Sequence, residues 1–198
     1  MSVHEGRELA QLIDSTNSGL GQVRAFLDDL AADQRLAAVR SLGPQQQRAL
    51  FGLAEGFMPL KLTDLVPAAQ PALSPVRHFG RNSMPLFKYF EKRFYRQRDG
   101  DSDLAGANFQ SLSPLTGAGY YVAREDSERG EVLIDYTQVP EIPPPGWPEI
   151  TRNERGVSRL VYGFMVDTLR RVSEHVTIGR AARHGKPMNA WFLLCREA

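Results

Sequence analysis

The hydrophobic pattern of this chain changes its period part-way along, and this change constrains the fold more than any other feature. Up to residue 57, apolar residues recur at helical spacing, as Leu20, Val23 and Leu27 do. From residue 119 on, apolar and polar residues alternate, which is the pattern of strands. The segments with this alternation are 119–125, 131–139, 159–166, 175–183 and 189–197. The sequence therefore predicts helices first and a sheet afterwards.

The connections between these strands indicate how they pair. Short turns that contain glycine, such as residues 126–130 and 183–187, are typical of hairpins and predict an antiparallel sheet. Some strands are apolar on both faces, which requires cover on both faces or a ligand cavity on one. We therefore predict the α+β class, with an N-terminal helical region packed on a curved antiparallel β-sheet or barrel.

The distribution of glycine and proline divides the chain into three regions. They are a helical region (1–57), a Pro-rich connector (58–76) and a barrel-like antiparallel domain (77–198). The prolines of the connector are too closely spaced for a helix or a central strand, and its leucines predict that it wraps over the core. In the third region, phenylalanines at helical spacing predict a short helix at about 84–95.

Charge and composition exclude several kinds of partner. The chain has 24 Lys+Arg and 23 Asp+Glu, a net charge of +1, so it gives no indication of a nucleic-acid partner. The N-terminus has no signal-peptide pattern, and no apolar run approaches the roughly 18 residues of a membrane span. With a single cysteine, this pattern predicts a cytoplasmic protein without membrane insertion.

We expect no cofactor and no metal. The four histidines lack any ligand spacing, and the P-loop, nucleophile-elbow and dinucleotide motifs are missing from the sequence. Cys195 lies in a strand pattern, where a thiol behaves as a small apolar residue. The basic segment 77–98 is either a solvated face or an anion-binding surface. Arg81 and Asn82 are candidate ligand-binding residues there because they precede a predicted helix N-terminus.

The last fifth of the chain resembles a known family. Residues 159–197 contain a strand, the pattern D-x-L-R-x-V, a polar bend, a strand with IGRA, a hairpin and a strand ending in WFLLCRE. This order is similar to the closing strands of lipocalin-like (calycin) barrels. The G-x-W opening of lipocalins is missing, and HFGRNSM stands at residues 78–84. The resemblance implies a β-barrel that binds a small, largely apolar molecule.

The polar stretch 167–175, DTLRRVSEH, is predicted to form the bend at one end of this barrel. Asp167 with Arg170 or Arg171 forms either a salt bridge that closes the end or a site where an arginine holds a ligand carboxylate or phosphate. Aromatic residues are expected to line the cavity wall, with core packing as their alternative role. The candidates are Tyr120, Tyr136, Tyr162 and Trp191.

Three functions are compatible with this sequence. The first is non-catalytic binding of a small apolar or amphiphilic molecule that carries an acidic group. The second is an isomerase-, cyclase- or hydratase-type enzyme that uses the same cavity, with Asp135 or His175 as general base. The third is a protein–protein interaction module that docks through its helical hairpin or the Pro-rich segment 140–148. A homodimer is compatible with all three.

Overall fold

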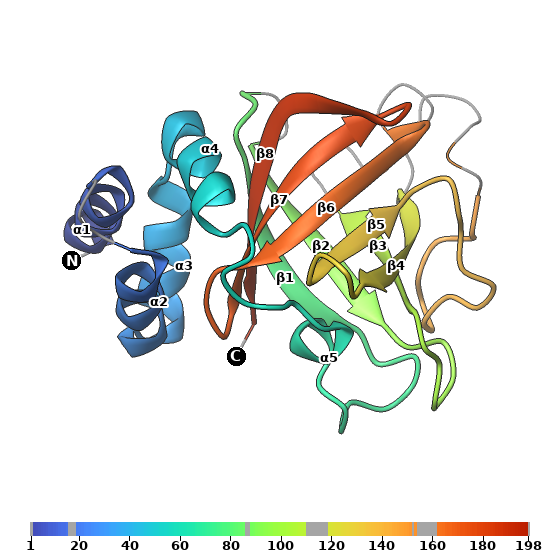
Figure 1. Ribbon diagram of the computed structural model, residues 1–198. Coiled ribbons are helices and arrows are strands. Elements are labelled where there is room, and N and C mark those ends of the chain that lie inside the picture. Colours follow the sequence, from blue (N-terminus) through green and yellow to red (C-terminus); the bar gives the residue numbers. More distant parts are fainter. Residues whose placement is uncertain are drawn as a thin grey trace.

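The chain folds as a closed barrel of antiparallel strands with helices on one side (Figure 1). The computed structural model describes residues 2–15, 19–85, 88–109, 119–151, 153 and 162–197. Within these ranges eight strands follow one another around the barrel, and the last pairs with the first. They are β1 (Val76–Asn82), β2 (Tyr89–Tyr95), β3 (Leu104–Phe109), β4 (Tyr120–Asp126), β5 (Glu131–Asp135), β6 (Met165–Arg171), β7 (Val176–Arg183) and β8 (Lys186–Arg196). The predicted α+β class is confirmed.

Strand alternation decides which side chains fill the barrel and which cover it. Along β2, Phe90, Lys92 and Phe94 face the interior, since every second residue of a strand points to the same side. Opposite them in register, Gly106 and Asn108 of β3 also face inward. The interior core contains aromatic and aliphatic side chains from every strand except β7. Every strand is therefore anchored by its neighbours and most also by the core that they enclose.

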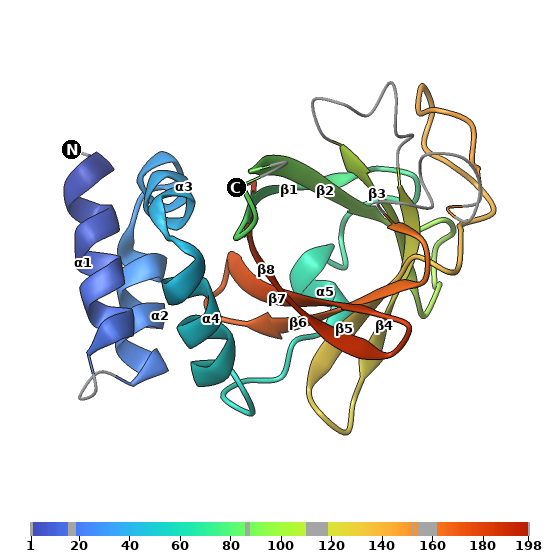
Figure 2. The same cartoon turned by 90° about the horizontal axis from the view of Figure 1, so that it is seen from above.

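The N-terminal helices cover one outer face of the barrel (Figure 2). They are α1 (Ser2–Asp14), α2 (Leu20–Asp29), α3 (Ala32–Ser41) and α4 (Pro44–Leu53). Helix α3 contacts β1 and β8, and α4 contacts β7 and β8. Outward residues of these strands, among them Ile178 and Leu193, join the apolar helix faces in a second core. None of the described helices is long and apolar enough to cross a membrane.

The Pro-rich connector packs against the interior core, as the sequence predicts. It contains the short helix α5 (Leu62–Leu65), and its buried apolar residues belong to the interior core. The Leu60 amide donates to the Gly130 carbonyl oxygen at 2.9 Å, and Arg96 donates to the carbonyl oxygens of Pro67 and Gln70. The connector is thus fixed to the barrel. Its buried residues are Leu60, Leu62, Leu65 and Val66.

Two predicted elements differ from the structure. The prediction of a short helix at about 84–95 is wrong, because Tyr89–Tyr95 is strand β2, paired with β1 and β3. Phenylalanines four residues apart share a face in a strand as well as in a helix, so the spacing did not separate the two. The strand predicted over 159–166 is displaced: residues 159–161 lie outside the described residues, and β6 begins at Met165. The first part of DTLRRVSEH therefore belongs to a strand, and the bend follows it.

Candidate functional site

Four polar side chains meet inside the barrel. Lys92 comes from β2, Asn108 from β3 and Asp167 from β6, and Tyr136 follows the last residue of β5. All four are buried, with exposed fractions between 1% and 8%. Each occupies an inward position of its strand or strand end, so the alternation of four strands brings them together. We call these four residues the interior cluster.

The ammonium group of Lys92 is the centre of the interior cluster. Lys92 Nζ donates to Asn108 Oδ1 at 3.1 Å, to Asp167 Oδ2 at 3.3 Å, and to the hydroxyl oxygen of Tyr136. Asn108 Nδ2 donates to the same hydroxyl oxygen at 2.9 Å. Three acceptors thus surround the three hydrogens of the ammonium group. This geometry favours the charged form of Lys92, with Asp167 as its counter-ion.

Aromatic rings enclose the interior cluster. Lys92 Nζ lies 5.0 Å from the ring centroids of Tyr121 and Phe192, within the range of cation–π attraction. The ring of Tyr162 stacks on that of Tyr136, with centroids 5.3 Å apart. Tyr162 therefore lies in the interior of the barrel, which is the location that the sequence analysis expects for it.

Glycines on the inward face let these rings lie against the barrel wall. A Cβ atom at Gly106 would collide with the Tyr121 ring, and one at Gly179 would collide with the Phe192 ring. The same relation holds between Gly80 and Phe90, which are direct partners of β1 and β2. A ring that covers a glycine of the next strand lies along the sheet rather than across the barrel.

Burial perturbs the ionisable groups of the interior cluster in opposite directions. Burial lowers the pKa of Lys92, and the neighbouring Asp167 charge opposes this effect. Burial raises the pKa of Asp167, and the charge and hydrogen bond of Lys92, with a hydrogen bond of Tyr136, oppose this effect. Burial also raises the pKa of Tyr162 to about 12 and that of Tyr136 well above its ordinary value. The tyrosines therefore stay neutral at neutral pH, and Lys92 and Asp167 carry the charge.

One polar atom of the interior cluster remains available. Asp167 Oδ1 is buried and has no hydrogen-bond partner among the described residues, whereas Oδ2 accepts from Lys92. A buried carboxylate oxygen without a donor costs free energy, so a donor is needed there. Asp167 Oδ1 is thus the atom of the interior cluster best able to accept a hydrogen bond from a bound molecule.

The two predicted ligand-binding arginines do not take part in the interior cluster. Arg170 faces outward and donates to Glu131 at 2.6 Å and to the carbonyl oxygen of Phe51 in α4. Arg171 pairs with Asp64 of α5 at 3.0 Å. The predicted salt bridge of Asp167 with Arg170 or Arg171 is therefore wrong. Asp167 pairs with Lys92, because alternation turns Asp167 inward and Arg170 outward.

The remaining predicted wall residues are split between the two sides of the barrel. Tyr136 and Tyr162 belong to the interior core. Tyr120 lies outside, where its hydroxyl donates to the Pro148 carbonyl oxygen at 2.5 Å. Trp191 also lies outside, in a surface pocket of about 390 Å³ beside α4.

The candidates in β1, Arg81 and Asn82, are adjacent strand residues and point to opposite sides of the barrel wall. Arg81 faces outward and lies over the Tyr89 ring, 5.5 Å from its centroid. Asn82 pairs in register with Phe192 of β8, and its backbone amide donates to the carbonyl oxygen of Lys88. The helix that would have made this segment an anion site does not begin here, because residues 83–85 form a bend and residues 89–95 form strand β2.

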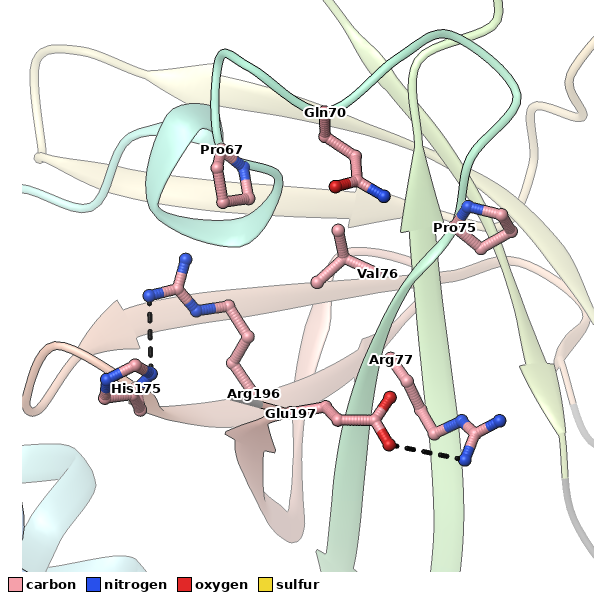
Figure 3. A pocket seen from close by; sticks show the side chains of 8 residues that line it. All are labelled: Pro67, Gln70, Pro75, Val76, Arg77, His175, Arg196 and Glu197. Atoms are coloured by element: carbon pink, nitrogen blue, oxygen red, sulfur yellow. Dashed lines mark hydrogen bonds and ion pairs between the residues drawn. The ribbon is translucent and has the colours of Figure 1, made fainter. Parts of the chain in front are cut away.

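The two candidate general bases are also outside the interior. Asp135 faces outward and accepts from the hydroxyl of Thr137 at 2.6 Å and from Arg124 at 3.1 Å, so it stabilises the turn after β5. His175 lines a surface pocket of about 460 Å³ below the connector. Figure 3 shows Arg196 directed at His175, to whose Nδ1 it donates at 3.3 Å. These positions do not bring Asp135 or His175 to the interior cluster.

Neither a metal centre nor a reactive thiol is indicated by the geometry. The described ranges hold no group of three or more His, Cys, Asp or Glu side chains placed to bind a metal ion. Cys195 is buried under the helix layer, and burial raises its pKa to about 11. A thiol with this pKa is protonated at neutral pH and is a poor nucleophile.

The sequence interpretation missed Lys92, Asn108 and the role of Asp167. A period-two interpretation of FKYFEKRFY would have placed Lys92 between two phenylalanines on one face, which is an unusual position for a lysine. The helical interpretation placed it on the solvent face instead. Asn108 has no comparable signal, since it lies in a segment of small residues.

Comparisons of the chain with protein-family models, curated proteins and solved structures found no match. A functional assignment therefore depends on the residues of the site.

Proposed function

We propose that this protein binds a small, largely apolar molecule inside the barrel without converting it, and that an acidic group of this molecule lies at the interior cluster. The observation that carries the proposal is the buried Lys92–Asp167 pair. Desolvating two charges costs several kcal/mol, and apolar residues of similar size often give equal or greater stability. Since the pair is not needed for the stability of the fold, we attribute its presence to a ligand whose polar group contacts it.

The barrel architecture supports the proposal. Eight-stranded barrels have interiors that side chains fill or that are just wide enough for one small ligand. Rings that lie along the wall, such as Tyr121 over Gly106, give the interior an apolar aromatic lining. The apolar body of the ligand would contact these rings, and its polar group would contact the interior cluster.

The resemblance of residues 159–197 to calycin closing strands belongs to the same proposal. Members of that family bind small apolar molecules in a closed antiparallel barrel, and closure of this barrel supports the likeness. The single buried thiol, Cys195, fits a reducing compartment such as the cytoplasm.

Binding is tested with decanoic acid and with decanol as its neutral counterpart. Both are titrated against the whole chain, and a thermal shift and displacement of a fluorescent amphiphile are recorded. We expect both probes to raise the melting temperature. Absence of a response to both would contradict the proposal.

A matched pair of variants tests where the probes bind. Tyr136→Phe removes a hydroxyl of the interior cluster, and Tyr120→Phe removes the hydroxyl of an equally buried tyrosine outside the barrel. We expect the first to weaken binding of decanoic acid and the second to leave it unchanged. Equal effects of the two variants would place the ligand elsewhere.

A further inference from the structure

The interior cluster is balanced in charge before any ligand is bound. Lys92 contributes the single positive charge and Asp167 the single negative charge, 3.3 Å apart. All three ammonium hydrogens face acceptors that are already present. A bound carboxylate would therefore bring a second negative charge to a site that holds one cation.

Two neighbouring carboxylates in a buried site do not both remain ionised. Their repulsion raises the pKa of one of them until a proton binds, and the two groups then share that proton. Asp167 Oδ1, which has no partner among the described residues, is the atom placed to share it. Burial already raises the pKa of Asp167, which favours protonation in the bound state.

We propose that an acidic ligand enters the barrel together with one proton, held in a hydrogen bond between its acid group and Asp167 Oδ1. This inference rests on the proposed function. The proton comes from solvent and no covalent bond is made or broken. A neutral ligand with a hydroxyl group donates its own hydrogen to Asp167 Oδ1 and needs no proton. The site is then selective for hydrogen-bond donors, and it accepts acids only in protonated form.

Among the residues that the structure describes, the other ionisable groups that face this site do not change charge near neutral pH. Burial raises the pKa of Tyr121 and Tyr136 well above its ordinary value and that of Tyr162 to about 12. At the connector end, burial lowers the pKa of His78 to about 4, so it is neutral. In the free protein, Lys92 and Asp167 together hold one titratable proton, which is on Lys92. A proton taken up on binding therefore belongs to the ligand and this pair.

The test is calorimetric titration of decanoic acid and decanol into the whole chain, in buffers with different ionisation enthalpies. We expect uptake of about one proton with the acid, and an association constant that falls about tenfold per pH unit between about pH 6 and pH 8. Decanol should bind with no proton uptake and no such slope. Binding of the acid without proton uptake would overturn the inference and leave the proposed function standing. If neither probe binds, both fail.

A variant locates the proton. Asp167→Asn places an amide where the carboxyl group lies, and this amide donates to a carboxylate without taking up a proton. We expect this variant to bind decanoic acid with no pH dependence and more tightly than wild type at about pH 8. The control is Asp135→Asn, a buried carboxylate outside the barrel, which should keep the slope of wild type. Proton uptake that persists in Asp167→Asn would overturn the inference, and the buffer series on wild type decides the matter if this variant does not fold.

Discussion

Lys92→Met is the substitution from which we expect the largest and most informative loss of stability. Methionine keeps much of the apolar stem and removes the charge, together with three hydrogen bonds to Asn108, Tyr136 and Asp167. It also leaves Asp167 buried without a cation. Breaking one side of a buried ion pair costs about 3–5 kcal/mol of the free energy of unfolding, and we expect a loss in this range at about pH 8.

The loss should depend on pH with a definite sign. Without Lys92, only a hydrogen bond of Tyr136 opposes the effect of burial, so the pKa of Asp167 rises further above its value in the unfolded chain. A group whose pKa is raised on folding favours the folded state at low pH, and this contribution disappears as the pH rises through the folded-state pKa. The variant should therefore be closest to wild type at about pH 5, and it should lose up to about 1.4 kcal/mol per pH unit above that.

Urea unfolding of the variant and wild type at about pH 5 and pH 8 measures both effects. The control is Lys88→Met, which removes an exposed lysine that precedes β2 and should change stability by less than about 0.5 kcal/mol. A second comparison is the double variant Lys92→Met with Asp167→Leu, which should recover most or all of the stability but lose affinity for decanoic acid. A loss below about 1 kcal/mol that is equal at both pH values would refute the reasoning.

Two further substitutions test the wall and the outer face of the barrel. Gly179→Ala should destabilise the fold by about 1–3 kcal/mol, because the added Cβ collides with the Phe192 ring. The control is Gly21→Ala in α2, whose added Cβ meets nothing within 4 Å and should leave stability unchanged or raise it. Thermal unfolding measures both variants. Arg170→Ala should cost about 1–3 kcal/mol in urea unfolding, because it leaves the buried Glu131 carboxylate without its donor. Since Arg170 lies outside the barrel, the same variant should keep the wild-type affinity for decanoic acid, and weaker binding would show that the acid site is misplaced.

The strands that the sequence predicts correctly are those with regular alternation between glycine turns. Segments corresponding to β4, β5, β7 and β8 have this pattern. Strands β1 and β3 escape prediction because their inward positions include Gly80 and Gly106, which make room for rings of neighbouring strands. Glycine has low strand propensity, so the residues that tertiary packing requires there obscure the local pattern.

The interior cluster could not be predicted from the pattern within any one segment of the sequence, for a different reason. The partners of Lys92 lie 16, 44 and 75 residues away in the sequence. Asn108 is the direct register partner of Lys92 on the neighbouring strand, and the curvature of the barrel brings Tyr136 and Asp167 to Lys92 across the interior. No spacing within one segment of the sequence reports either relation. The aromatic residues Tyr136 and Tyr162 were predictable as interior candidates because alternation assigns a face, but alternation does not say which face is inside.

The position of the helix layer has a consequence for how the chain is made. Helix α3 covers the line where β1 meets β8, and the helix face that contains Leu27, Val39 and Leu50 packs with Leu193 of β8. During synthesis, α1–α4 leave the ribosome before any strand, and β8 follows all the others. The part of this helix face that packs on β8 therefore stays exposed to solvent until almost the whole described chain has emerged. Docking of the helices on β8 and joining of the first strand to the last both require β8, so neither can be completed before the last strand has emerged.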